Sequence, residues 1–208
     1  MKTFALILTA LILVAGSTLA QTTDLFISEY VEGSSNNKAV EIFNGSGDLA
    51  NLGQYTLLIY ANGGTTPAQT MPLDAVEMDT GDTFVLVNSS AEAHLLAYAN
   101  QVSASLTFNG DDALVLVKDD EVIDSIGTIG FDPGSSWSCD DGSTVNNTLR
   151  RRAEICNGDT NAYDDFDVCL EWTFFVVDTF DGLGMHTTDC SSVATGPGSW
   201  GSLKAIYR

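Results

Sequence analysis

Short runs of hydrophobic residues, separated by turn-forming residues, recur along the chain from position 25 onward. The first two runs, residues 25–31 and 38–44, are rich in Ile, Val, Phe and Tyr, which are enriched in β-strands. The loop between them reads EGSSNN and is typical of a turn. The pattern therefore predicts a β-hairpin that carries Glu29 in one strand and Glu41 in the other.

Strand-like runs continue through the rest of the chain. One short helix is predicted around residues 93–99, where apolar residues follow Ser89, Ser90 and Glu92 in a pattern that can cap a helix. Many short strands with one short helix predict an all-β sandwich. The further strands are expected at residues 55–61, 83–88, 113–117, 122–126, 148–152 and 172–177.

The first 20 residues have the features of a secretory signal peptide. Lys2 supplies a positive start, residues 4–15 are apolar, and the small residues GSTLA lead to an expected cleavage site after Ala20. No other apolar run is long enough to cross a bilayer as a helix, so no transmembrane segment is expected. The sequence thus predicts an exported protein that is secreted or lies at the cell surface.

Acidic residues far outnumber basic ones, and the formal net charge is −20. Such a charge argues against general binding to nucleic acids or anionic lipids, because long-range repulsion opposes both. Residues 150–152 are three consecutive arginines, but alternate residues of a strand face opposite sides. They are therefore expected to pair with carboxylates rather than to form one basic patch.

The four cysteines all lie in the second half of the chain. An exported chain meets an oxidising compartment, so two disulfides are expected, and the absence of a CxxC pair argues against zinc. Three pairings are possible. The sequential one, Cys139–Cys156 with Cys169–Cys190, is the working prediction.

The C-terminal residues differ in composition from the rest of the chain. Residues 191–199, SSVATGPGS, have the composition of a flexible linker, and residues 200–208, WGSLKAIYR, form a short basic peptide. This peptide is either a disordered end or a docking peptide that binds a protein partner or a cell-surface component. Its candidate docking residues are Trp200, Leu203, Lys204, Ile206, Tyr207 and Arg208.

Several motifs in order along the chain resemble the lamin tail domain family, in particular the branch found in exported bacterial proteins. The resemblance covers residues 24–190 and implies an immunoglobulin-like β-sandwich with no catalytic residues to carry over. This branch often lies beside an extracellular nuclease domain, which the present chain lacks. The motifs are LFISEYVEGSSNNKAVEIFN, LTFNGDDALVLVK, VIDSIGTIGFDPGSSW, NTLRRR and DTFDGLGMHT.

Two groups of oxygen-bearing side chains are candidate calcium sites, because calcium prefers carboxylate and carbonyl oxygens. If the opening hairpin forms, Glu29 and Glu41 come close together, and Glu32 can join them. Strict alternation places Glu29 on one face with Leu25, Ile27 and Val31, and Lys38 is its nearest candidate partner in sequence. The second group is Asp159, Asn161, Asp164, Asp165 and Asp167. For both groups, the alternative to calcium binding is a purely structural role.

No catalytic constellation is evident around the two histidines, His94 and His186. No G-x-S-x-G or H-E-x-x-H motif accompanies them. The turn at Phe108–Asp112, FNGDD, is explained by backbone preferences alone. The sequence predicts a non-catalytic binding or structural module in extracellular or surface assembly. Two alternatives stay open: an accessory to an extracellular nuclease system, and a calcium-stabilised structural unit.

Overall fold

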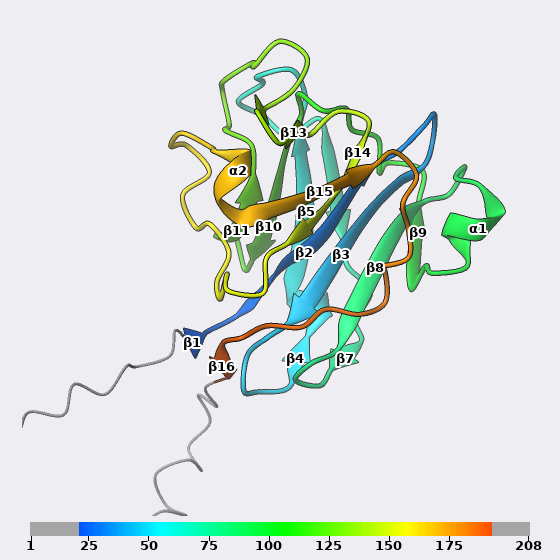
Figure 1. Cartoon of the computed structure of the whole chain (residues 1–208). Coiled ribbons are helices and arrows are strands. Elements are labelled where there is room, and N and C mark those ends of the chain that lie inside the picture. Colours follow the sequence, from blue (N-terminus) through cyan, green and yellow to red (C-terminus); the bar gives the residue numbers. More distant parts are fainter. Residues whose placement is uncertain (1–20, 193–208) are drawn as a thin grey trace, which may run out of the picture.

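The structure of the protein, a computed structural model, describes residues 21–192. In this range two β-sheets pack face to face, with short strand pairs and helices around them (Figure 1). The larger sheet has the strand order β15-β14-β2-β3-β8-β9, and its neighbours are antiparallel except for β8 and β9. Its strands are β2 (Leu25–Glu32), β3 (Lys38–Asn44), β8 (Thr83–Asn88), β9 (Gln101–Ser103), β14 (Asn147–Arg151) and β15 (Trp172–Val176).

The smaller sheet is fully antiparallel and has the order β11-β10-β5-β6. The two packed sheets confirm the predicted immunoglobulin-like β-sandwich. The strands of the smaller sheet are β5 (Tyr55–Tyr60), β6 (Gln69–Pro72), β10 (Ala113–Lys118) and β11 (Glu121–Ile126). Three further pairs join β1 (Gln21–Thr22) to β16 (Ser191–Ser192), β4 (Ala50–Asn51) to β7 (Glu77–Met78), and β12 (Ser138–Cys139) to β13 (Gly142–Ser143).

The helices of the described residues are short, and they differ from the predicted single helix. The expected helix is α1 (Ala93–Leu96), but Glu92 precedes it without a side-chain capping bond, so the serine cap was wrong. A second helix, α2 (Val168–Glu171), was missed in the acidic stretch; the side chain of Asp167 caps it by accepting a hydrogen bond from Cys169 N. A 3₁₀ turn, η1 (Leu52–Gln54), leads into β5.

The main hydrophobic core fills the space between the two sheets. Trp172, Tyr30, Leu57 and Leu114 are among its fully buried members. Burying one such large side chain stabilises the fold by about 1.5–3 kcal/mol. A second apolar cluster lies on the outer face of the larger sheet, where Phe180 and α1 cover the strands. Both faces of this sheet are therefore covered.

A β-bulge in β2 changes the expected alternation of its side chains. The pairing of β2 with β3 shifts by one residue between Ile27 and Glu29, so Ser28 is the extra residue. Tyr30 consequently joins Ile27 in the main core, and Glu29 lies on the outer face with Phe26 and not with Ile27. The face assignment from strict alternation was therefore wrong.

The two ends of the described chain meet in a short parallel pairing of β1 with β16. This pairing lies just outside residues 24–190, the expected limits of the domain. The predicted signal peptide, residues 1–20, and the C-terminal peptide, residues 200–208, lie outside the described residues, as does the expected linker after Ser192. No helix within residues 21–192 has the length and apolar character needed to span a membrane.

Candidate functional site

The two glutamates of the opening hairpin are buried and directly opposite each other on the outer face of the larger sheet. Glu29 of β2 pairs in register with Glu41 of β3, which confirms that the hairpin brings them together. Glu41 accepts hydrogen bonds from Ser28 Oγ at 2.7 Å and from Gly184 N at 2.6 Å. The chain that follows β15, drawn in orange in Figure 1, runs over this face towards β16. The carboxylate of Glu41 thus helps to hold that segment on the sheet.

The partner of Glu29 is Arg150 of β14, and not Lys38 as expected. The Arg150 Nε atom lies 3.0 Å from Glu29 Oε2, and its Nη2 atom lies 2.5 Å from Asp181 Oδ1. Glu29 Oε1 is buried and has no hydrogen-bond partner among the residues that the structure describes. Burial raises the pKa of Glu29 from 4.5 to about 8; Arg150 opposes this shift, and the charge of Glu41 adds to it. Burial also raises the pKa of Glu41.

Glu32 does not join the other two glutamates, because it binds the hairpin loop. Its Oε1 atom is 2.7 Å from Lys38 Nζ, which also donates to Gly33 O at 2.6 Å. Its other carboxylate oxygen accepts a hydrogen bond from Asn146 N. Asp178, in the segment after β15, accepts hydrogen bonds from both Ser34 N and Oγ. The EGSSNN loop is therefore held in place by two distant parts of the chain, through the Asp178 carboxylate and the backbone N–H of Asn146.

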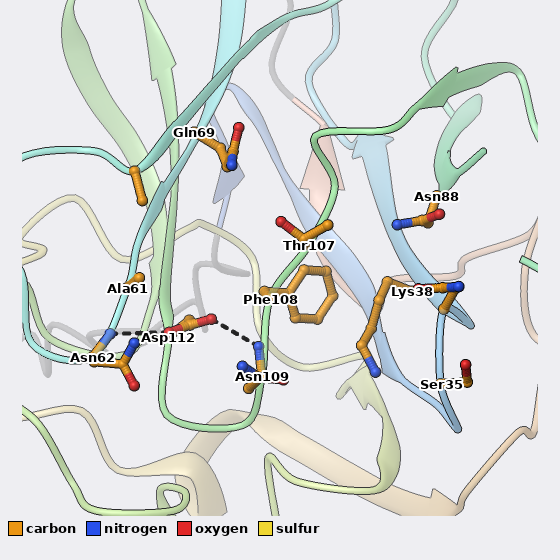
Figure 2. Close-up of a pocket in the computed structure, with 12 residues that line it drawn as sticks. Ser35, Lys38, Ala61, Asn62, Gln69, Asn88, Thr107, Phe108, Asn109 and Asp112 are labelled. Carbon is orange, nitrogen blue, oxygen red and sulfur yellow. Dashed lines mark hydrogen bonds between the residues drawn. The ribbon is translucent and has the colours of Figure 1, made fainter. Parts of the chain in front are cut away.

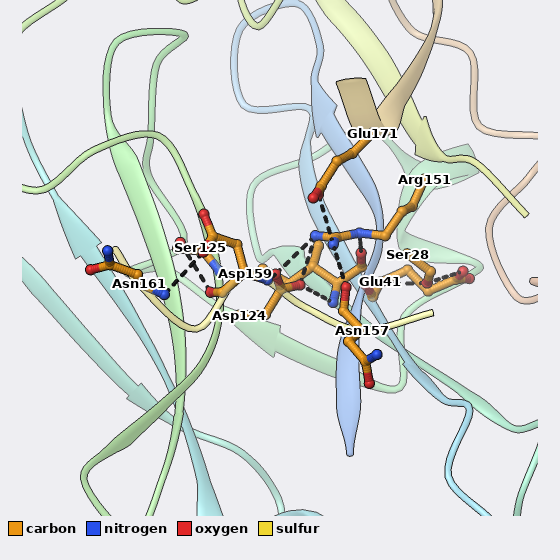
Figure 3. Close-up of polar contacts among 10 residues, drawn as sticks. Ser28, Glu41, Asp124, Ser125, Arg151, Asn157, Asp159, Asn161 and Glu171 are labelled. Atoms are coloured by element: carbon orange, nitrogen blue, oxygen red, sulfur yellow. Dashed lines mark hydrogen bonds and ion pairs between the residues drawn. The ribbon is translucent and has the colours of Figure 1, made fainter. Parts of the chain in front are cut away.

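A fully buried ion pair connects the two sheets between Arg151 of β14 and Asp124 of β11 (Figure 3). The Arg151 Nη2 atom donates to both Asp124 oxygens, at 3.0 and 2.8 Å, and its Nε atom donates to Ile27 O at 2.7 Å. Glu171 of α2 accepts from Nη1 at 3.0 Å. Sequence reasoning missed Asp124, whose only signal was an acidic residue inside the hydrophobic run VIDSI. The expected opposite directions of Arg150 and Arg151 are confirmed, as is their pairing with carboxylates.

The acidic stretch at residues 157–167 forms hydrogen bonds within the loop and to β11. Asp159 N donates to Asp124 Oδ1 at 2.8 Å, while Asp159 Oδ1 accepts from Asn161 N at 2.9 Å. Asn161 Nδ2 donates to Asp164 Oδ2 at 3.0 Å, and Asp167 caps α2. Among residues 21–192, no three His, Cys, Asp or Glu side chains are grouped so that they could hold a metal ion. Calcium binding at either acidic group, Asp165 included, stays a prediction.

The cysteines pair in an alternating order, which corrects the sequential prediction. Cys139 is bonded to Cys169 and Cys156 to Cys190, with Cα–Cα distances of 6.2 and 5.6 Å. The reason lies in the path of the chain. After β14 the chain runs along β11 and then forms α2, which places Cys169 beside Cys139 in the β12–β13 hairpin. The C-terminal segment returns to the residues after β14, where Asp189 N donates to Ala153 O, and this places Cys190 beside Cys156. Two disulfides fit an oxidising, extracellular environment.

Both histidines pack against aromatic rings on the outer face of the larger sheet. His186 makes edge contacts with Phe26 and Phe43, at centroid distances of 5.7 and 4.8 Å. Burial lowers the pKa of His186 to about 4, so its imidazole is neutral at pH 7. His94 contacts Phe180. These surroundings give both side chains a packing role.

A polar pocket of about 310 Å³ opens at the end of the sandwich that carries the EGSSNN loop (Figure 2). Four separate segments form its wall: residues 35–38, residues 61–69, Asn88 and residues 107–112. Sequence reasoning treated the FNGDD turn as purely structural and had no signal for this pocket, because its lining residues come together only in the fold. Its lining residues are Ser35, Asn36, Lys38, Ala61, Asn62, Ala68, Gln69, Asn88, Thr107, Phe108, Asn109 and Asp112.

Comparison with known proteins gives one family and no individual relative. No curated protein matches the chain, and no solved structure matches it. Residues 18–130 match the family model described as Lamin Tail Domain. Because this match covers more than half of the 208 residues, the protein belongs to the lamin tail domain family.

Proposed function

We propose that this protein is an exported, non-catalytic module that binds a partner at the cell surface or in the extracellular space. The proposal rests on the contrast between the buried and the exposed polar side chains of the protein. The buried ionisable side chains Glu29, Glu32, Asp124 and Arg151 are paired or hydrogen-bonded to hold the sandwich together. The exposed polar groups at the loop end instead line an open pocket. Polar groups fixed in a rigid scaffold suit recognition by loops at one end of a sandwich.

Two features support the proposed location of the protein outside the cell. The predicted signal peptide directs the chain out of the cytoplasm. The disulfides Cys139–Cys169 and Cys156–Cys190 require oxidising conditions to form and persist. Both support a module that acts outside the cell.

A surface-binding assay tests the binding part of the proposal. Purified protein spanning residues 21–208 is added to cells that lack it, and the retained fraction is measured against concentration after washing. Saturable retention is expected. Retention that grows linearly with concentration, as for any acidic protein, would contradict a binding module.

The C-terminal peptide is tested by comparing the full chain with a version that ends at residue 199. We propose that Trp200 and the basic residues Lys204 and Arg208 dock on a surface or export component. Truncation should therefore move protein from the cell-bound fraction to the medium, or retain it inside the cell. Identical partitioning of the two versions would remove the docking role.

A nuclease assay separates this proposal from a role in nucleic-acid degradation. Purified protein is incubated with DNA and RNA in calcium, in magnesium and in chelator, and no cleavage above buffer is expected. Metal-dependent cleavage that persists through successive purification steps would overturn the non-catalytic assignment.

A further inference from the structure

The loop-end pocket contains side-chain amides that make no hydrogen bond to any other described residue. Three of these amides belong to Asn62, Gln69 and Asn109, each from a different turn or strand end of the pocket wall (Figure 2). Asn88, in the same wall, is different: its Nδ2 donates to Leu106 O at 2.9 Å, and its Oδ1 accepts from Ser90 N at 2.7 Å. Each unbound amide offers two donors and an acceptor to a ligand.

The two charged residues in the wall are both bonded within the protein, Lys38 to a carboxylate and Asp112 to backbone N–H groups. Lys38 Nζ is 2.7 Å from Glu32 Oε1. The carboxylate of Asp112 accepts hydrogen bonds from Asn62 N at 3.0 Å and from Asn109 N at 2.8 Å. No uncommitted positive charge is left to attract an anion, and the net charge of −20 repels one.

The pocket has little apolar surface to offer a ligand. Phe108 is only 2% exposed, because its ring packs against Tyr30 at a centroid distance of 4.9 Å. The other apolar lining residues are the two alanines at positions 61 and 68. An apolar small molecule would gain little here, and a peptide would lack pockets for its alternate side chains. The chemistry that fits is a neutral ligand with many hydroxyl groups.

We propose that this pocket binds a neutral carbohydrate, and that the amides of Asn62, Gln69 and Asn109 pair with its hydroxyl groups. An amide can donate to one hydroxyl and accept from its neighbour, so adjacent sugar hydroxyls match it. The volume of about 310 Å³ lies at the small end of ligand sites, which suits one or two sugar units. This inference rests on the proposed function, since it names the ligand class of a binding module.

Binding is measured by calorimetry with the full chain from residue 21 onward. The probes are neutral cello-, xylo-, manno-, malto- and chito-oligosaccharides, with oligogalacturonate as the charged comparison. The test variant combines Gln69→Ala with Asn109→Ala. Neither side chain makes a hydrogen bond to another residue within 21–192, so the melting temperature of the variant should match that of the wild type. The matched control is Gln54→Ala, an exposed glutamine at the end of η1 outside this pocket.

At least one neutral oligosaccharide should bind the wild type and the Gln54→Ala control equally. The double variant should bind it about 5- to 100-fold more weakly, because two hydrogen-bonding groups are lost. The proposal is overturned if no neutral oligosaccharide binds, if only oligogalacturonate binds, or if the double variant binds as tightly as the wild type. Saturable surface binding that the double variant retains would reject the carbohydrate pocket and leave the binding function standing.

Discussion

The buried carboxylate of Glu29 should make the stability of the protein depend strongly on pH between about 4.5 and 8. Its folded-state pKa, about 8, lies above its ordinary value of 4.5, so the folded state holds the proton more tightly than the unfolded state. The stabilisation from this proton is fully present below pH 4.5 and is lost as the pH rises through 8. Since one pKa unit corresponds to 1.36 kcal/mol, the loss amounts to at most about 5 kcal/mol.

The substitution Glu29→Gln removes this titration and keeps the shape of the side chain. The difference in unfolding free energy between wild type and variant should therefore move in favour of the variant as the pH rises from 4.5 to 8. The groups that face Glu29 are Arg150 from β14, Glu41 from β3 and Asp181 from the segment after β15. They are unchanged in the variant, so the difference between the two curves isolates Glu29.

Urea unfolding at several pH values from 4.5 to 9, with intact disulfides, measures this effect. Fluorescence of the buried Trp172 reports on unfolding. The control is Glu121→Gln, an exposed glutamate at the start of β11, which should give a curve parallel to the wild type. If the Glu29→Gln curve also runs parallel to the wild type, Glu29 does not titrate in this range and the reasoning fails.

Three further predictions concern stability. Asp124→Ala leaves the guanidinium of Arg151 buried without its main partner, so urea unfolding should show a loss of about 3–5 kcal/mol; a loss below 1 kcal/mol would contradict the role of this ion pair. Replacing Cys156 and Cys190 together by serine should cost about 3–4 kcal/mol, because the bond closes a loop with a sequence separation of 34; unchanged stability would contradict the pairing. If calcium binds at either candidate group, the melting temperature should be higher in millimolar calcium than in chelator, because a ligand specific to the folded state stabilises it; no shift at saturating calcium would remove the calcium-stabilised alternative.

The disulfide pairing could not be predicted from the positions of the four cysteines in the sequence. Cysteine spacing allowed three pairings, and the observed one depends on how the chain travels between β14 and α2. The short helix α2 was hidden for a related reason. It forms where Asp167 caps four residues that the Cys139–Cys169 disulfide joins to the β12–β13 hairpin, and this contact between distant segments is not visible in the local sequence.

Local composition by itself determined the opening hairpin, the opposite directions of Arg150 and Arg151, the sandwich class, and the strands of the two sheets except β6 and β9. These follow from side-chain shape and from the two-residue period of a strand, which act over a few neighbouring positions. Tertiary structure decided the bulge at Ser28, the pairing of Arg151 with Asp124, and the polar pocket at the loop end. Each depends on sheet register and on contacts between segments far apart in the chain, and a single sequence does not specify which distant groups meet.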